Sequence, residues 1–149
     1  MRVVAQRCVD ARVEVAGEVV GAIGAGLVAF VGCGRGDDAG TVDAMVDKVL
    51  GLRVFVDDAG KMSRCLTDLG LELLVVSQFT LYGDVRRGRR PSFDAALEPT
   101  LAAALIERFV AAARRRGVTV SEGRFGADMR VLVANDGPVT ILVDSQKSF

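Results

Sequence analysis

Histidine is absent from this chain of 149 residues, and aromatic residues make up only 5% of it. Without histidine the chain cannot form a Ser-His-Asp triad, a Cys-His dyad or the usual histidine-containing metal sites. A hydrolase with this sequence must therefore work by another route. Half of the residues are hydrophobic, so the shortage of aromatics indicates an aliphatic core rich in Val and Ala.

Cysteine is also scarce, with only Cys8, Cys33 and Cys65. Their number is odd and no two of them form a Cys-x-x-Cys pair, so neither a disulfide framework nor a zinc site is predicted. Each is expected to be a small buried hydrophobic residue. We therefore expect no metal and no cofactor.

Net charge and long apolar runs are missing as well. The 19 basic and 19 acidic residues cancel, so nucleic acid could be bound only by a local patch. No run reaches the roughly 18 apolar residues of a membrane span. Residues 1–7 lack the apolar core of a signal peptide and are predicted to form a strand. We expect a cytoplasmic protein that does not enter a membrane.

The remaining patterns predict many short strands and two helices. Glycines between the first three expected strands indicate a β-meander. The expected fold is α+β, with a curved, barrel-like, mostly antiparallel sheet in a single domain of residues 1–149. The expected strands are 2–15, 18–23, 27–31, 52–56, 71–78, 118–121, 130–134 and 139–143. One expected helix is capped by Asp37 or Asp38 and ended by Gly51, and the other runs from Pro99 to about Arg116.

Two further details of these elements are predicted. In the second helix, Leu97, Leu101, Leu105 and Phe109 recur every four residues and are expected to form its apolar face. Residues 135–138, Asn-Asp-Gly-Pro, are expected to form a turn between the last two strands.

A polar strand end is the first candidate site. The apolar run Leu73–Val76 predicts a buried strand, and it ends abruptly in Ser77 and Gln78. A hydroxyl and an amide at the edge of a core need partners, and a substrate could be one. The alternative is a strand that simply leaves the core into a turn.

Two other segments suggest different functions. The segment 32–37, Gly-Cys-Gly-Arg-Gly-Asp, only partly matches a dinucleotide-binding fingerprint, so a simple connection is favoured over a phosphate cradle. The loop 86–90 holds four arginines, which can bind phosphate bidentately. That loop is either a nucleic-acid contact or a solubilising segment.

Two motifs together resemble a known family. Residues 77–81 (Ser-Gln-Phe-Thr-Leu) and 135–140 (Asn-Asp-Gly-Pro-Val-Thr) resemble the paired signatures of the D-aminoacyl-tRNA deacylases. The resemblance extends over nearly the whole chain. It includes residues 6–7, 17–19, 23–27, 60–62, 90–93 and 123–125.

The resemblance implies a homodimeric esterase that binds the 3′ end of aminoacylated tRNA and has its active sites at the subunit interface. It would release D-amino acids from tRNA, and also glycine mischarged on tRNA(Ala), as a chiral proofreading step. Gly137 and Pro138 of one subunit would enter the pocket of the other, where their main-chain oxygens exclude L side chains. The 2′-hydroxyl of the tRNA would assist the chemistry.

The remaining roles also follow from the resemblance. The implied catalytic group consists of Ser77, Gln78, Phe79 and Thr80, which would position the ester and stabilise its developing oxyanion. Without an evident base, the Thr80 hydroxyl is poorly activated as a nucleophile, which favours a positioning role. The implied substrate-binding residues are Arg7 near the pocket entrance, Phe125 and Met129 near the adenine, and Gly137 and Pro138.

Overall fold

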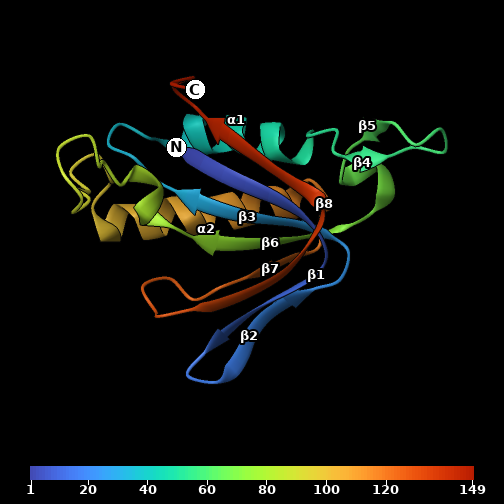
Figure 1. The fold of residues 1–149 in the computed structure, drawn as a ribbon, viewed down its shortest axis with the longest axis horizontal. Coiled ribbons are helices and arrows are strands. Elements are labelled where there is room, and N and C mark those ends of the chain that lie inside the picture. The colour runs from blue at the N-terminus through green and yellow to red at the C-terminus, as the bar shows by residue number, and fades with distance from the viewer.

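A curved six-stranded sheet and two helices make up most of the molecule (Figure 1). The computed structural model describes residues 1–149. The sheet order is β2-β1-β3-β6-β7, and β8 pairs with the other edge of β1. This confirms the expected α+β fold. The elements are β1 (Arg2–Val15), β2 (Glu18–Ile23), β3 (Gly26–Gly32), α1 (Ala39–Leu50), β4 (Phe55–Val56), β5 (Met62–Arg64), β6 (Glu72–Ser77), α2 (Pro99–Arg115), β7 (Val120–Glu122) and β8 (Arg130–Asp144), with short 3₁₀ turns η1 (Thr67–Leu69) and η2 (Phe79–Tyr82).

The expected β-meander is wrong, because β2 and β3 do not pair with each other. Both pair with β1 in succession: Ala11 lies opposite Ile23, and Cys8 opposite Gly26. The register against β1 is the same on both sides of this junction, so Gly24 and Gly26 interrupt one long strand and do not reverse the chain. A side chain at Gly26 would lie 1.9 Å from the Glu72 carbonyl oxygen. Glycine is needed there because β6 approaches so closely.

The sheet is mixed and bends until its ends almost meet. All three ladders of β1 are antiparallel, whereas β6 runs parallel to both β3 and β7. At the far end, the Ser121 hydroxyl in β7 donates to the Ala22 carbonyl in β2 at 2.8 Å. This contact brings the two outer strands together, and it gives the sheet the barrel-like shape that the sequence predicts.

The main core lies between the sheet and the two helices. Helix α1 begins at the Asp38 cap, whose carboxylate accepts the Thr41 amide at 2.8 Å. Its buried face consists of residues that recur at helical spacing: Val42, Met45, Val46, Val49 and Leu50.

The predicted apolar face of α2 is wrong at Leu101 only, because Phe109 is buried and Leu97 and Leu105 pack against the core. Leu101 is 56% exposed, and the buried residues are Ala102, Ile106, Phe109, Val110, Ala112 and Ala113. A helix turns about 100° per residue, so a strict four-residue repeat drifts by about 40° at each step. The buried positions 102, 106, 109 and 113 alternate steps of four and three, which keeps them on one side.

Strand β8 is continuous through residues 135–138, so the predicted turn is wrong. Cys8 pairs with Asn135 and Gln6 pairs with Thr140, which leaves extra residues in β8 opposite Arg7. This is a β-bulge. Gly137 within it has φ +118°, a conformation suited to glycine, and the Gly137–Pro138 peptide bond is cis.

A small separate hairpin, β4–β5, replaces the predicted strand 52–56 and the unassigned segment after it. The turn between its strands is held by Asp57, whose carboxylate accepts the Ala59 and Lys61 amides. No group of three or more His, Cys, Asp or Glu side chains could hold a metal ion. Neither helix has the length and apolar character needed to cross a membrane.

Candidate active site

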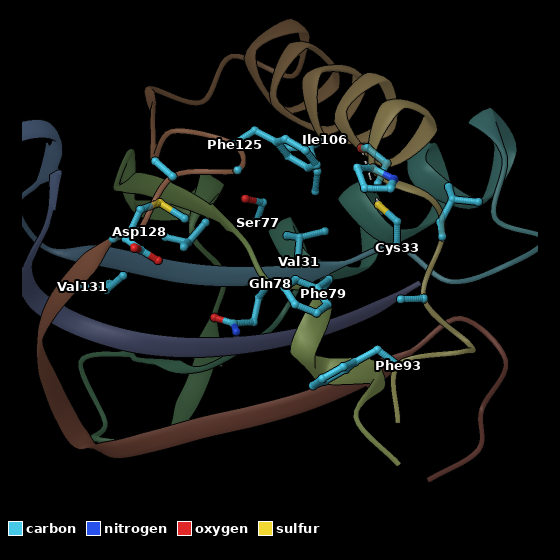
Figure 2. A pocket seen from close by; sticks show the side chains of 18 residues that line it. Val31, Cys33, Ser77, Gln78, Phe79, Phe93, Ile106, Phe125, Asp128 and Val131 are labelled. Atoms are coloured by element: carbon cyan, nitrogen blue, oxygen red, sulfur yellow. Dashed lines mark hydrogen bonds between the residues drawn. The ribbon is translucent and has the colours of Figure 1, made fainter. Parts of the chain in front are cut away.

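A cavity of about 580 Å³ opens where β6 ends. The end of β6 and the start of η2 form one wall, the first half of α2 another, and the loop 123–129 a third (Figure 2). Most of its lining is apolar. Five predicted site residues lie in this wall: Ser77, Gln78, Phe79, Phe125 and Met129.

Ser77 and Gln78 occupy the point where β6 leaves the sheet. The main-chain N–H of Gln78 still donates to the Val31 carbonyl at 2.8 Å, and η2 begins directly afterwards. Successive strand residues face opposite sides. Figure 2 accordingly shows the Ser77 side chain on the side of the strand where Phe125 and Ile106 lie, while the side-chain amide of Gln78 lies on the other side. The polar strand end is therefore part of a cavity and not only a route into a turn.

Thr80 does not line the cavity. It is exposed on η2, and its hydroxyl is hydrogen-bonded to the side-chain amide of Gln78. The cavity wall contains no lysine or arginine, and Asp128 is its one carboxylate. Without histidine or lysine, the wall offers only the Asp128 carboxylate as a base that could activate a hydroxyl nucleophile.

The aromatic side chains of the wall come from separate parts of the chain. Phe79 and Phe93 meet edge to face, with ring centroids 5.0 Å apart. Phe125 lies in the opposite wall and is 41% exposed. Sequence reasoning did not predict Phe93, Ile106 or Asp128 as wall residues, because nothing in their spacing indicates that α2 folds over the end of β6.

Cys33 also belongs to this wall, and it is buried as predicted. Burial raises the pKa of the Cys33 thiol to about 11, and the nearby Asp37 carboxylate acts in the same direction. The thiol is therefore protonated at neutral pH and is not a nucleophile. Cys8 is buried likewise, whereas Cys65 is partly exposed.

The glycine-rich segment 32–37 is a packed connection, not a phosphate cradle. Asp37 accepts the Gly34 amide at 2.6 Å, so that donor is already used. A side chain at Gly34 would lie 2.4 Å from the Tyr82 hydroxyl oxygen. Glycine at this position lets the Tyr82 ring pack against the chain.

Arg7, Gly137 and Pro138 lie together but outside this cavity. The Arg7 guanidinium donates to the Val54 carbonyl at 2.5 Å and lies 3.0 Å from the Asp136 carboxylate. The Asn135 amide donates to the Arg7 and Val139 carbonyls at 3.2 and 3.0 Å. These contacts hold the β8 bulge, so Arg7 and the Gly137–Pro138 corner form one unit.

Two solved structures share this fold. One described as "c-Myc DNA Unwinding Element Binding Protein" is 39% identical, with a TM-score of 0.92 over 97% of this chain and 98% of that chain. Another, described as a probable eukaryotic D-amino acid tRNA deacylase, is 21% identical, with a TM-score of 0.82 over 95% of this chain and 97% of that one. The second likeness shows the shared fold alone.

Sequence comparison identifies the family. The family model for D-Tyr-tRNA(Tyr) deacylase matches residues 4–144. A D-aminoacyl-tRNA deacylase of Sorangium cellulosum is 64% identical, and those of Desulfitobacterium hafniense and Thermotoga petrophila are 54% and 52% identical, each over the whole of both chains. The chain therefore belongs to the D-Tyr-tRNA(Tyr) deacylase family. The family and the enzyme class that the two motifs predict are thereby confirmed.

Proposed function

We propose that this protein hydrolyses the ester that joins a D-amino acid, or glycine mischarged on tRNA(Ala), to the 3′-terminal adenosine of tRNA. Water adds to the carbonyl carbon and the ribose 3′-oxygen leaves with a proton, which yields the free amino acid and tRNA. The cavity at the end of β6 carries this proposal, because it brings Ser77, Gln78 and Phe79 into one wall opposite Phe125 and Met129.

In this proposal Ser77, Gln78 and the main chain of Phe79 and Thr80 position the carbonyl and stabilise its developing negative charge. Phe125 and Met129 hold the adenine through apolar and stacking contacts. The wall offers no histidine, lysine or arginine that could act as a general base. As the resemblance to the family implies, the 2′-hydroxyl of the terminal ribose is assigned the task of assisting the attacking water.

Selection against L-amino acids is assigned to Gly137 and Pro138 of a partner subunit. The corner lies outside the cavity of its own chain and is exposed, so it is available to enter a neighbouring cavity. Its carbonyl oxygens would fill the space that an L side chain needs. Glycine has no side chain and would be accepted. Because Arg7 is bonded to the same bulge, it would serve the partner's cavity too.

The surface of β8 supports a homodimer. Pro138, Thr140 and Leu142 alternate along the exposed face of this strand, and Leu142 is 61% exposed. Leu142 lies on the same exposed face as the Gly137–Pro138 corner, so a subunit contact made by that corner would also cover this apolar side chain. The proposed enzyme is thus a homodimer that acts on tRNA in the cytoplasm.

Matched substrates test the proposal. The protein should release tyrosine from D-tyrosyl-tRNA with a kcat/KM at least about 100-fold above that for L-tyrosyl-tRNA, equivalent to about 2.7 kcal/mol. D-tyrosyl-tRNA whose terminal 2′-hydroxyl is replaced by hydrogen should be cleaved far more slowly. Equal or absent release from the D and L substrates would refute the function, whereas undiminished cleavage of the deoxy substrate would refute only the 2′-hydroxyl step.

A further inference from the structure

The most basic segment of the chain is an exposed loop that the proposed chemistry does not use. This arginine loop, residues 84–94, is closed at its base by Asp84 and Ser92, which exchange backbone hydrogen bonds of 2.7 and 3.0 Å. Its four arginines are all exposed: Arg86, Arg87, Arg89 and Arg90.

The arginine loop encloses a second cavity of about 460 Å³ with an entirely polar lining, which consists of Asp84, Arg86, Arg87, Arg90, Ser92 and Asp94. Its two carboxylates already have partners within the loop. Asp84 is bound by Arg86 at 2.6 and 2.9 Å, and Asp94 accepts the Ser92 hydroxyl at 2.8 Å. Arg87 and Arg90 take part in no ion pair.

Half of the twelve arginines elsewhere in the chain are arranged differently, because they have a carboxylate partner. Arg2, Arg7, Arg12, Arg108, Arg114 and Arg116 all lie beside a carboxylate. In a chain of zero net charge, the arginine loop therefore concentrates guanidinium groups that lack an internal anion. Guanidinium groups in a polar hollow suit the bidentate binding of phosphate oxygens.

The arginine loop is joined directly to the main cavity. Phe93 belongs to the loop, lines the main cavity and packs on Phe79 at 5.0 Å. Figure 2 shows Phe93 below Phe79 at the lower edge of that site, and Figure 1 shows the yellow loop beside the start of α2. A strand of nucleic acid whose last nucleoside occupies the main cavity would thus pass this loop.

We propose that Arg87 and Arg90 bind the phosphates of the single-stranded 3′ end of tRNA, just before the nucleotide that carries the amino acid. This inference rests on the proposed function, because the main cavity must receive the terminal aminoacyl-adenosine. Contacts to phosphates do not depend on the base sequence of the tRNA. The loop would therefore give affinity for any tRNA, while the main cavity selects the aminoacyl group.

The test compares two double variants of equal charge. Arg87→Gln/Arg90→Gln removes the unpaired guanidinium groups of the polar cavity. Lys48→Gln/Arg115→Gln removes two exposed cations from the ends of α1 and α2, and Arg115 lies roughly 25 Å along its helix from Pro99, which lines the main cavity. Fluorescence anisotropy with uncharged tRNA measures affinity over a range of salt concentrations. Kinetics use D-tyrosyl-tRNA and 3′-O-D-tyrosyl-adenosine, which has no phosphate.

The loop variant should bind tRNA about tenfold more weakly, and the slope of log affinity against log salt should become shallower by about 1.4, or about 0.7 for each lost phosphate contact. Its KM for D-tyrosyl-tRNA should rise by a similar factor at unchanged kcat, while hydrolysis of D-tyrosyl-adenosine stays at the wild-type rate. The control variant should match the wild type on tRNA.

Three results are decisive. Wild-type tRNA affinity in the loop variant would overturn the inference, and so would an equal loss on both substrates, which would mean that the loop only shapes the main cavity. Arginine-dependent tRNA binding by a wild-type protein that cleaves neither substrate would uphold the phosphate contact and refute the proposed function instead.

Discussion

Single residues in the cavity wall show how burial controls reactivity here. Cys33 has a potentially nucleophilic side chain within the candidate site, but burial raises its pKa to about 11 and keeps the thiol neutral. Cys8 is also buried, and its pKa is likewise raised to about 11, mainly by burial. A neutral buried thiol is a small hydrophobic residue, as the sequence predicts for both.

Unfolding should depend on pH through these two thiols. Because the folded-state pKa is raised above the ordinary value of 9.0, the stabilisation is complete below pH 9 and is lost as the pH rises toward 11. Each thiol should lower the free energy of unfolding by about 1.4 kcal/mol per pH unit in that window. Urea titrations between pH 8 and 11 should show a shallower decline for Cys33→Ala. Parallel curves for the two proteins would contradict this.

Thr80 provides a second test at the residue scale. Its hydroxyl lies outside the cavity and meets only the Gln78 amide, so Thr80→Ala should keep kcat for D-tyrosyl-tRNA within about tenfold of the wild type. Gln78→Ala, which alters the cavity wall itself, should reduce kcat more. Loss of all activity in Thr80→Ala, with fold and tRNA affinity intact, would indicate that the threonine hydroxyl attacks the ester.

At the scale of elements, the β8 bulge determines where the Gly137–Pro138 corner lies. The sequence motif correctly marks residues 135–140 as special, but it predicts a turn because Asn, Asp, Gly and Pro are turn residues. The pairing of β1 with β8 on both sides of the bulge keeps the strand continuous. The helix α2 shows a similar limit: its residues predict a helix, whereas packing against the sheet selects the buried face.

Asn135 should stabilise this bulge. Its side chain donates to two main-chain oxygens, of Arg7 and Val139, and each such bond contributes about 1 kcal/mol. Asn135→Ala should lower the free energy of unfolding by about 2 kcal/mol and should weaken discrimination between D- and L-tyrosyl-tRNA. Asn135→Asp, of equal size but without the donors, should behave similarly. Wild-type stability and selectivity in both variants would refute this role.

At the scale of the whole molecule, the proposed site is incomplete within one chain. Its cavity holds the strand-end residues, whereas the Gly137–Pro138 corner lies outside that cavity. The proposed homodimer therefore leads to an expectation that does not hold for a self-contained monomer. If one chain carries a damaged corner and the other a damaged cavity, a mixed dimer contains one site in which an intact cavity meets an intact corner.

Mixing two defective variants tests this directly. A side chain at Gly137 would lie 2.8 Å from the Val139 side chain and 2.9 Å from the Arg7 guanidinium, so Gly137→Ala should distort the corner, while Gln78→Ala damages the cavity. If the corner acts in the partner, co-refolding equal amounts should restore about a quarter of wild-type activity, because half of the dimers are mixed and one of their two sites is intact. No recovery beyond the separate variants would place both halves in one chain.

The sequence by itself determined the enzyme class, most of the strands, the two helices and five residues of the cavity wall, because these depend on residue type, local periodicity and two contiguous motifs. Only the tertiary structure decided that β2 and β3 extend along one edge of β1, that Phe93 and Asp128 join the wall, and that Arg7 shares a bulge with Gly137. Those outcomes depend on contacts between residues far apart in the chain. Pairing register and helix packing set these contacts, and no local pattern encodes them.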